Sequence, residues 1–192
     1  MLNKKYFQKI RQDLLSYAEK RREVIKAAGD AQHHAKRAIF ALQRDERGEA
    51  DVSLKSALAN LNKLVKRYNQ PEDTHLFDEG SFRAAVEEYT EAAIFKQFLD
   101  GENIGPPAEV KVASEQYISG LCDVPGELVR YAIKAATERD FKTVKRCYAA
   151  AEAIIGELIS MDLTGYHRQK FDQAKQALSK LQQIVYEVSL KK

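Results

Sequence analysis

Apolar residues recur every three to four positions along most of this chain, which is the spacing of an amphipathic α-helix. Only nine Gly and four Pro interrupt the 192 residues, so the predicted helices are long and their ends are clearly marked. No strand pattern, repeat or low-complexity tract competes with this interpretation. We expect a loop over residues 70–80. The pattern predicts six helices, over about residues 3–47, 49–68, 81–100, 114–138, 141–160 and 166–190.

The first predicted helix is unusually long. It spans more than 40 residues before a break at Gly48, with a candidate bend at Gly29, and is therefore longer than ordinary helices of globular proteins. Such length is typical of helices that pack in a bundle or an assembly. We therefore expect an all-α fold, an elongated antiparallel bundle of about six to seven helices, in a single domain over residues 1–192.

The composition is that of a soluble chain that can bury a core. Hydrophobic residues make up 44% of the chain and charged residues 31%, and no apolar run approaches the roughly 20 residues of a membrane span. The N-terminal segment alternates charged and apolar residues, unlike the apolar block of a secretory signal. Two cysteines, Cys122 and Cys147, are too few for a disulfide framework or a zinc site. We expect a cytoplasmic protein without membrane contact.

Charge is unevenly distributed, although the net charge is only +3. Residues 1–70 hold 16 basic and 8 acidic side chains, residues 71–128 hold 3 and 13, and residues 129–192 hold 12 and 7. The net charges of the three segments are therefore +8, −10 and +5. An acidic middle between basic segments is consistent with a metal centre within a phosphate-attracting surface, and equally with ion pairing within or between subunits.

Two pairs of acids at helical spacing lie in the acidic middle. Glu88 and Glu91 are three residues apart and Asp123 and Glu127 four apart, so each pair projects from one helix face. Carboxylate oxygens suit Mg²⁺ or Mn²⁺, which can polarise a phosphate and lower the pKa of water, so two facing pairs predict a hydrolytic nuclease site. The spacing alone is also typical of solvated helices. Glu87 also reaches the face of Glu91, and we rank it below Glu88.

Small and apolar neighbours around both pairs indicate that the acids are partly buried. Buried carboxylates are costly unless they share a proton or pair with a cation, so a metal is a natural partner if the two faces meet. Pro125 lies within the second pair. It either kinks one continuous helix or lies in the first turn of a new helix that Asp123 caps, and a capping Asp123 has a structural role only.

Four segments of the sequence match one family pattern in order. Residues 117–130 (YISGLCDVPGELVR) run from a tyrosine-led apolar segment through Gly to an Asp, a Gly-Glu-Leu and an Arg. Residues 36–44 (KRAIFALQR) form a basic helix, residues 88–98 (EYTEAAIFKQF) an acidic one and residues 181–190 (LQQIVYEVSL) the closing helix. Together these segments resemble the translin and Trax family over nearly the whole chain.

The resemblance is closest to Trax-type subunits and to prokaryotic, archaeal family members. It implies a metal-dependent endoribonuclease that cleaves single-stranded RNA with activated water, and leaves single-stranded DNA as a second ligand. It also implies a closed homo-oligomer, an octamer, or a translin-like partner subunit. Pro125 departs from the family pattern, so a non-catalytic translin-like nucleic-acid-binding protein is the alternative. The implied site residues are Glu88, Glu91, Asp123 and Glu127 for Mg²⁺ or Mn²⁺ and catalysis, and Lys36, Arg37 and Arg44 for RNA.

Several single residues leave other roles open. Glu72 and His75 have the Glu-x-x-His spacing of di-iron bundles, but a second such set is missing from the sequence. Cys122 is a nucleophile candidate, although a small buried thiol is the commoner role for such a residue. Tyr89 either stacks on unpaired bases or packs in the core. A structural or adaptor bundle without metal or nucleic-acid affinity is the remaining alternative.

Overall fold

The computed structural model describes residues 1–107 and 112–190, and within these ranges the chain forms six α-helices, one 3₁₀-helix and no strand. The predicted all-α fold is therefore confirmed. None of the helices in the described ranges is long and apolar enough to cross a membrane. The elements are α1 (Lys4–Gln43), α2 (Arg47–Arg67), η1 (Pro71–Asp78), α3 (Gly80–Asp100), α4 (Ser114–Thr137), α5 (Phe141–Ile159) and α6 (Gly165–Ser189).

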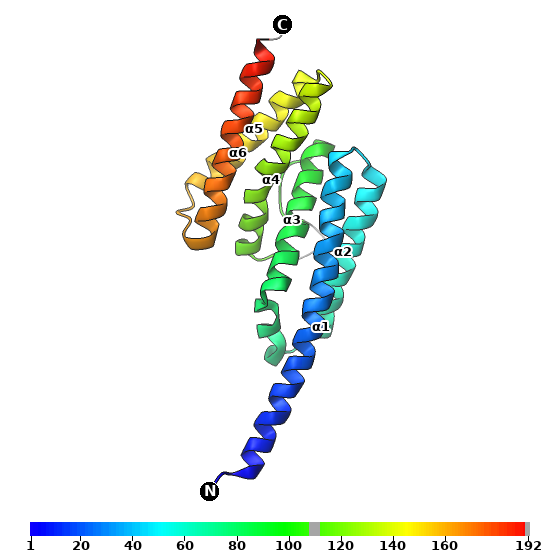
Figure 1. Ribbon diagram of the computed structural model, residues 1–192, viewed down its shortest axis with the longest axis vertical. Helices are drawn as coiled ribbons and strands as arrows, with labels where there is room; N and C mark the ends of the chain where they lie inside the picture. The colour runs from blue at the N-terminus through cyan, green and yellow to red at the C-terminus, as the bar shows by residue number, and fades with distance from the viewer. Residues whose placement is uncertain (108–111, 191–192) are drawn as a thin grey trace.

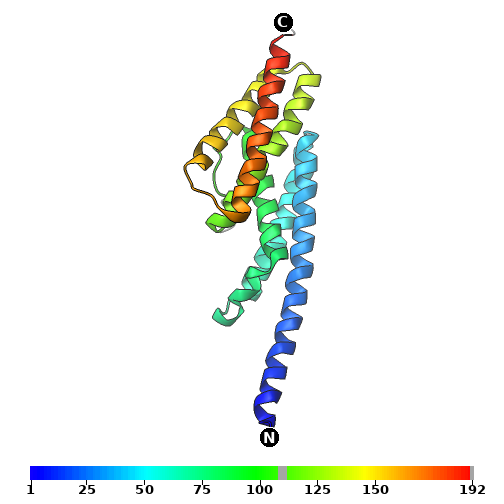
Figure 2. The same ribbon diagram turned by 60° about the vertical axis from the view of Figure 1, so that its left-hand side comes forward.

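The helices form an elongated array with α3 and α4 at its centre (Figure 1). Helix α1 turns back into α2, and α3 packs against α1 on one side and α4 on the other. Helices α4, α5 and α6 pack on one another at the C-terminal end. The first part of α1 projects beyond the bundle, and the first buried residue of this helix is Val24 (Figure 2). With a rise of about 1.5 Å per residue, α1 is roughly 60 Å long.

Two hydrophobic cores hold α3 and α4 in place. The first core joins α1, α2 and the start of α3, and buried alanines such as Ala28, Ala31 and Ala35 let these helices approach closely. The second core joins α3 to α4, α5 and α6 around large side chains such as Phe95 and Leu128. Because α3 contributes to both cores, the acidic helices α3 and α4 have a fixed relative position.

The predicted break at Gly48 is wrong. Helix α1 ends at Gln43, the chain turns over the next three residues, and Gly48 lies inside α2. Asp45 makes the turn with a φ of 62°, a left-handed conformation that Asp tolerates better than most residues. Its carboxylate accepts hydrogen bonds from the hydroxyl of Tyr131, at 2.6 Å, and from Lys134. Contacts with α4, which are distant in sequence, therefore place this turn.

One further expectation is corrected, and the two alternatives at Pro125 are resolved. The predicted loop over residues 70–80 largely forms the 3₁₀-helix η1, with Pro71 at its first position, where a missing N–H costs nothing. Helix α4 runs without a break through Pro125, so Asp123 lies inside a helix and does not cap one. The lost backbone hydrogen bond is offset by burial, because Val124, Pro125 and Leu128 all lie in the interior.

Candidate functional site

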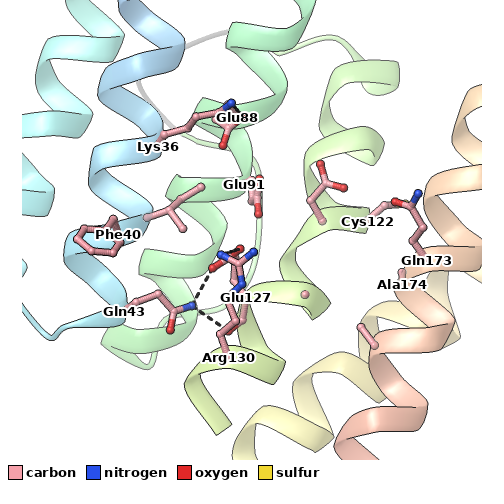
Figure 3. A pocket seen from close by; sticks show the side chains of 14 residues that line it. Lys36, Phe40, Gln43, Glu88, Glu91, Cys122, Glu127, Arg130, Gln173 and Ala174 are labelled. Atoms are coloured by element: carbon pink, nitrogen blue, oxygen red, sulfur yellow. Dashed lines mark hydrogen bonds and ion pairs between the residues drawn. The ribbon is translucent and has the colours of Figure 1, made fainter. Parts of the chain in front are cut away.

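The four predicted acids line one pocket. Glu88 and Glu91 enter it from α3, and Asp123 and Glu127 enter it from α4. Figure 3 shows Glu88, Glu91 and Glu127 around this space, with Lys36 reaching towards Glu88 from α1. The pocket has a volume of about 560 Å³. Its other lining residues are Lys36, Ile39, Phe40, Gln43, Cys122, Gly126, Arg130, Gln173, Ala174 and Ala177.

The acids meet because α3 and α4 touch at the level of their backbones. A Cβ atom on Gly120 of α4 would lie 2.8 Å from the carbonyl oxygen of Glu87 and 3.0 Å from the amide nitrogen of Glu91. Only a residue without a side chain allows this approach. Helical spacing places each pair of acids on one face, and the Gly120 contact brings the two faces together.

Glu91 is the most unusual of the four acids. Only 7% of the surface of Glu91 is accessible to solvent. Its carboxylate has no hydrogen bond or ion pair within the described part of the chain. Burial raises the pKa of Glu91 well above its ordinary value, and repulsion from Asp123, Glu127 and Glu88 raises it further. Lys170 opposes these effects only weakly, as the smallest contribution. Glu91 is therefore a buried acid in need of a cation or a proton.

Each of the other three acids has a cationic neighbour. The Glu88 carboxylate lies 3.8 Å from Lys36 Nζ, and the Glu127 carboxylate lies 3.2 Å from Arg130 Nη1. Asp123 accepts a hydrogen bond of 2.5 Å from Lys170 on α6. Burial nevertheless raises the pKa of all three carboxyl groups above the ordinary value. The cations therefore compensate only part of the negative charge in the pocket.

Glu87 lies outside the acid pocket. Its carboxylate accepts a hydrogen bond of 3.0 Å from the hydroxyl of Tyr166 and lies 3.4 Å from Lys170 Nζ. It lines a separate pocket of about 240 Å³ between the starts of α3, α4 and α6. Of the two neighbouring glutamates, Glu88 is therefore the one that faces the predicted site.

The four acids of the pocket fit a hard divalent cation, since they offer carboxylate oxygens in partly buried surroundings. Within the described residues, no three Asp, Glu, His or Cys side chains converge closely enough to hold one metal ion. Repulsion from all three neighbouring acids contributes to the raised pKa of Glu91, so a bound cation would relieve it. Holding an ion requires the carboxylates to rotate towards the centre of the pocket.

The three predicted RNA-binding residues are not gathered at the pocket. Lys36 lines it, whereas Arg37 and Arg44 face the start of α2. Arg37 pairs with Glu49 at 3.1 Å, and Arg44 pairs with Glu46 and lies over the ring of Phe40. Lys36 is therefore the basic residue of this group that is best placed to meet a phosphate at the pocket.

Sequence reasoning missed three lining residues with clear contacts. Phe40 is 62% exposed beside the acids, and the amide of Gln43 donates a hydrogen bond of 2.8 Å to Glu127 Oε2. Arg130 is exposed and lines the pocket from α4, whereas Phe40 and Gln43 line it from α1. Lys36, Phe40 and Gln43 are four and three residues apart, so helical spacing could have grouped them on one face. Lys170 lies 47 residues from Asp123, and no local pattern pointed to it.

The other candidate residues lie in structural positions. Tyr89 is 3% exposed and packs in the core between α1, α2 and α3, so it cannot stack on bases. Burial raises the pKa of Cys122 to about 11, which keeps its thiol protonated and poorly nucleophilic. Glu72 and His75 lie in η1, outside the acid pocket, where the ring of His75 packs on Tyr17.

The raised pKa of Glu91 predicts that this residue lowers the free energy of unfolding of the metal-free protein at high pH. Because this acid holds its proton more tightly when folded, its contribution to stability is complete below the ordinary pKa of 4.5 and is lost as the pH rises through the folded value. We expect Glu91→Gln to raise the melting temperature in EDTA by several degrees at pH 7.5, at about 2–4 °C per kcal/mol, and by almost nothing at pH 4.

Calorimetry at both pH values measures this difference, and Glu157→Gln, an exposed acid on α5, is the matched control. An equal gain at both pH values would show that ionisation of Glu91 is not the cause.

Comparison with known proteins places the chain by sequence and by structure. A model of the Translin family matches residues 19–192. The crystal structure of apo-NeC3PO is 17% identical, with 98% of each chain covered and a TM-score of 0.85. The crystal structure of AfC3PO and the structure of its duplex RNA complex are both 23% identical, cover 97% of this chain and 98% of the other, and have TM-scores of 0.86. A comparison with curated proteins finds no match.

Proposed function

Because the chain belongs to the translin family, we propose that it is a metal-dependent endoribonuclease of the Trax type that cleaves single-stranded RNA. The observation that carries this proposal is the convergence of four acids from α3 and α4 on one pocket, where Glu91 lacks a counterion. A structural helix bundle has no need for an uncompensated buried carboxylate, since such a group is destabilising.

In this proposal Glu88, Glu91, Asp123 and Glu127 hold Mg²⁺ or Mn²⁺. The ion would supply positive charge for the developing phosphoryl oxyanion and would acidify a water molecule. One or more of the four carboxylates also takes up the proton of the attacking water. No covalent nucleophile on the protein is needed for this hydrolysis.

Residues around the acids suit a strand of RNA. Lys36 and Arg130 lie on opposite sides of the pocket and can attract the phosphates on either side of the scissile bond. The exposed ring of Phe40 offers a surface on which an unpaired base can stack. Unpaired bases are available in single strands, and this favours single-stranded RNA, with single-stranded DNA as a second ligand.

We further propose a closed homo-oligomer, an octamer as the family resemblance implies, or an assembly with a translin-like partner subunit. Exposed apolar side chains on the projecting part of α1 support an assembly, since large exposed apolar groups on one surface usually mark an interface. They include Tyr6, Phe7, Leu14 and Leu15.

A non-catalytic translin-like nucleic-acid-binding protein is the second candidate function. It is favoured by one observation, namely that no three acids in the described residues converge closely enough for one ion. In that case the pocket would bind nucleic acid through Lys36 and Arg130 without hydrolysing it.

Cleavage of labelled RNA by the purified protein in Mg²⁺, Mn²⁺ or EDTA separates the two functions. A single strand and a blunt duplex of the same sequence should be compared, because the structurally similar AfC3PO has been solved with duplex RNA. Metal-dependent cleavage of the single strand is the expected result. Binding without cleavage would support the second function, and equal cleavage of the duplex would overturn the preference for single strands.

The positions of the basic residues predict different effects on RNA binding. Lys36 lies at the pocket, whereas its neighbour Arg37 is paired with Glu49. We expect Lys36→Ala to weaken binding of single-stranded RNA and to reduce the slope of log K against log salt by about 0.7, the loss of one phosphate contact. Arg37→Ala is the matched control and should leave the slope unchanged. Fluorescence anisotropy in EDTA at several salt concentrations measures both, and a larger change for Arg37→Ala would contradict the prediction.

A further inference from the structure

Lys170 on α6 joins the acid pocket to the C-terminal helices. Its Nζ atom lies 2.5 Å from Asp123 Oδ2 and 3.4 Å from Glu87 Oε2. The ring of Tyr166 lies 5.2 Å from the same atom, and the hydroxyl of Tyr166 donates to Glu87. The Lys170 side chain is only 12% exposed, so its charge is held in one place.

Lys170 contacts Asp123 without lining the pocket. It is not among the residues that line the pocket, in contrast to Lys36 and Arg130, the exposed cations beside the other acids. A phosphate in the pocket would therefore meet Lys36 or Arg130 before Lys170. The position of Lys170 suits a fixed counterion for one carboxylate and not a contact with RNA.

We propose that Lys170 is a positioning residue that sets the affinity of the acid pocket for divalent cations. It holds Oδ2 of Asp123 on the α6 side, which leaves Oδ1 for a metal, and its own charge opposes a second cation on the same carboxylate. This inference rests on the proposed function, in which the four acids bind Mg²⁺ or Mn²⁺. Removal of the lysine charge should therefore tighten metal binding.

Calorimetric titration of the full chain with Mn²⁺ tests this directly, without RNA or cleavage. We expect Lys170→Met to bind Mn²⁺ about tenfold more tightly than the wild type, because an ammonium near the ion has been removed. Lys170→Arg keeps the charge and should stay within about twofold of the wild type. Lys175→Met is the matched control on the same helix, since the Lys175 side chain is 42% exposed and pairs with Asp172.

Loss of Lys170 leaves Glu87 and Asp123 without their shared cation and could unfold the metal-free protein. The double variant Lys170→Met with Glu87→Gln removes one positive and one negative charge, and so it restores the local balance. Circular dichroism before each titration checks the fold. Tighter Mn²⁺ binding by the double variant supports the proposal in the same way as the single variant.

The outcomes separate this inference from the proposed function. If the wild type binds Mn²⁺, Glu91→Gln abolishes binding and both Lys170 variants bind no more tightly, Lys170 does not set the affinity, but the acid site stands. If Lys170→Met binds Mn²⁺ and the wild type does not, the role of Lys170 is supported. If neither protein binds Mn²⁺, both proposals fail.

Discussion

Glu91→Gln should lower the rate of RNA cleavage by about 10²–10⁴-fold while leaving RNA binding near the wild-type level. The substitution keeps the size of the side chain and removes its negative charge, so the pocket loses one of its four carboxylates. We expect binding to persist because Lys36 and Arg130, the two cations proposed to attract phosphates, are unchanged. A drop of this size would identify Glu91 as part of the chemistry.

Single-turnover cleavage of labelled single-stranded RNA in Mn²⁺ gives the rate, and anisotropy in EDTA gives the affinity. The control is Glu157→Gln, the same change on the exposed surface of α5. Unfolding cannot explain the expected loss, because the raised pKa of Glu91 predicts that the metal-free variant is more stable at neutral pH. Retention of the rate within about threefold would remove Glu91 from the mechanism.

The acid pocket could be predicted in part, because helical periodicity is a local property of the sequence. The spacing of Glu88 with Glu91, and of Asp123 with Glu127, places each pair on one face before any tertiary contact forms. Whether those two faces meet depends on packing between residues distant in sequence, since Glu91 and Asp123 are 32 positions apart. Gly120 allows the two faces to meet, and this role can be recognised only from its distance to the α3 backbone in the structure.

Tertiary contacts also explain what the sequence could not predict. Gly48 looked like the end of the first helix, but Lys134 and Tyr131 hold Asp45 in a left-handed turn three residues earlier. Pro125 could have started a new helix, but burial of its neighbours keeps α4 continuous. In both cases a local preference is overridden by contacts with residues distant in sequence.

Ion pairs likewise distinguish the basic residues that lie at the pocket from those that lie outside it. Lys36, Arg37 and Arg44 form one basic run in sequence, yet Glu46 and Glu49 of the following turn and helix pair with the two arginines. Lys170, which has no local signal, pairs with Asp123 across α4 and α6. Many of the charged side chains of the chain therefore form ion pairs, and Lys36 and Arg130 form theirs with acids of the pocket.

The contact between α3 and α4 predicts that Gly120→Ala is strongly destabilising. The added Cβ atom would lie 2.8 Å from Glu87 O, 2.9 Å from Thr90 Cβ and 3.0 Å from Glu91 N. Two of these are backbone atoms and Thr90 is fully buried, so the helices must move apart. Overpacking of this kind costs about 1–3 kcal/mol or more. At about 2–4 °C per kcal/mol, the melting temperature should fall by roughly 2–12 °C.

Gly156→Ala is the matched control for this prediction. Gly156 lies inside α5 and a Cβ atom there would have no neighbour within 4 Å, so Ala should stabilise the helix by about 0.5–1 kcal/mol. Thermal unfolding of both variants in EDTA compares the same substitution with and without the clash. A melting temperature for Gly120→Ala at or above that of the wild type would show that the helices do not meet at their backbones. Gly120 packs against the backbone of Glu91. Folded Gly120→Ala should therefore also bind Mn²⁺ more weakly than Gly156→Ala. Such a result would show that the packing of α3 on α4 sets the spacing of the acids.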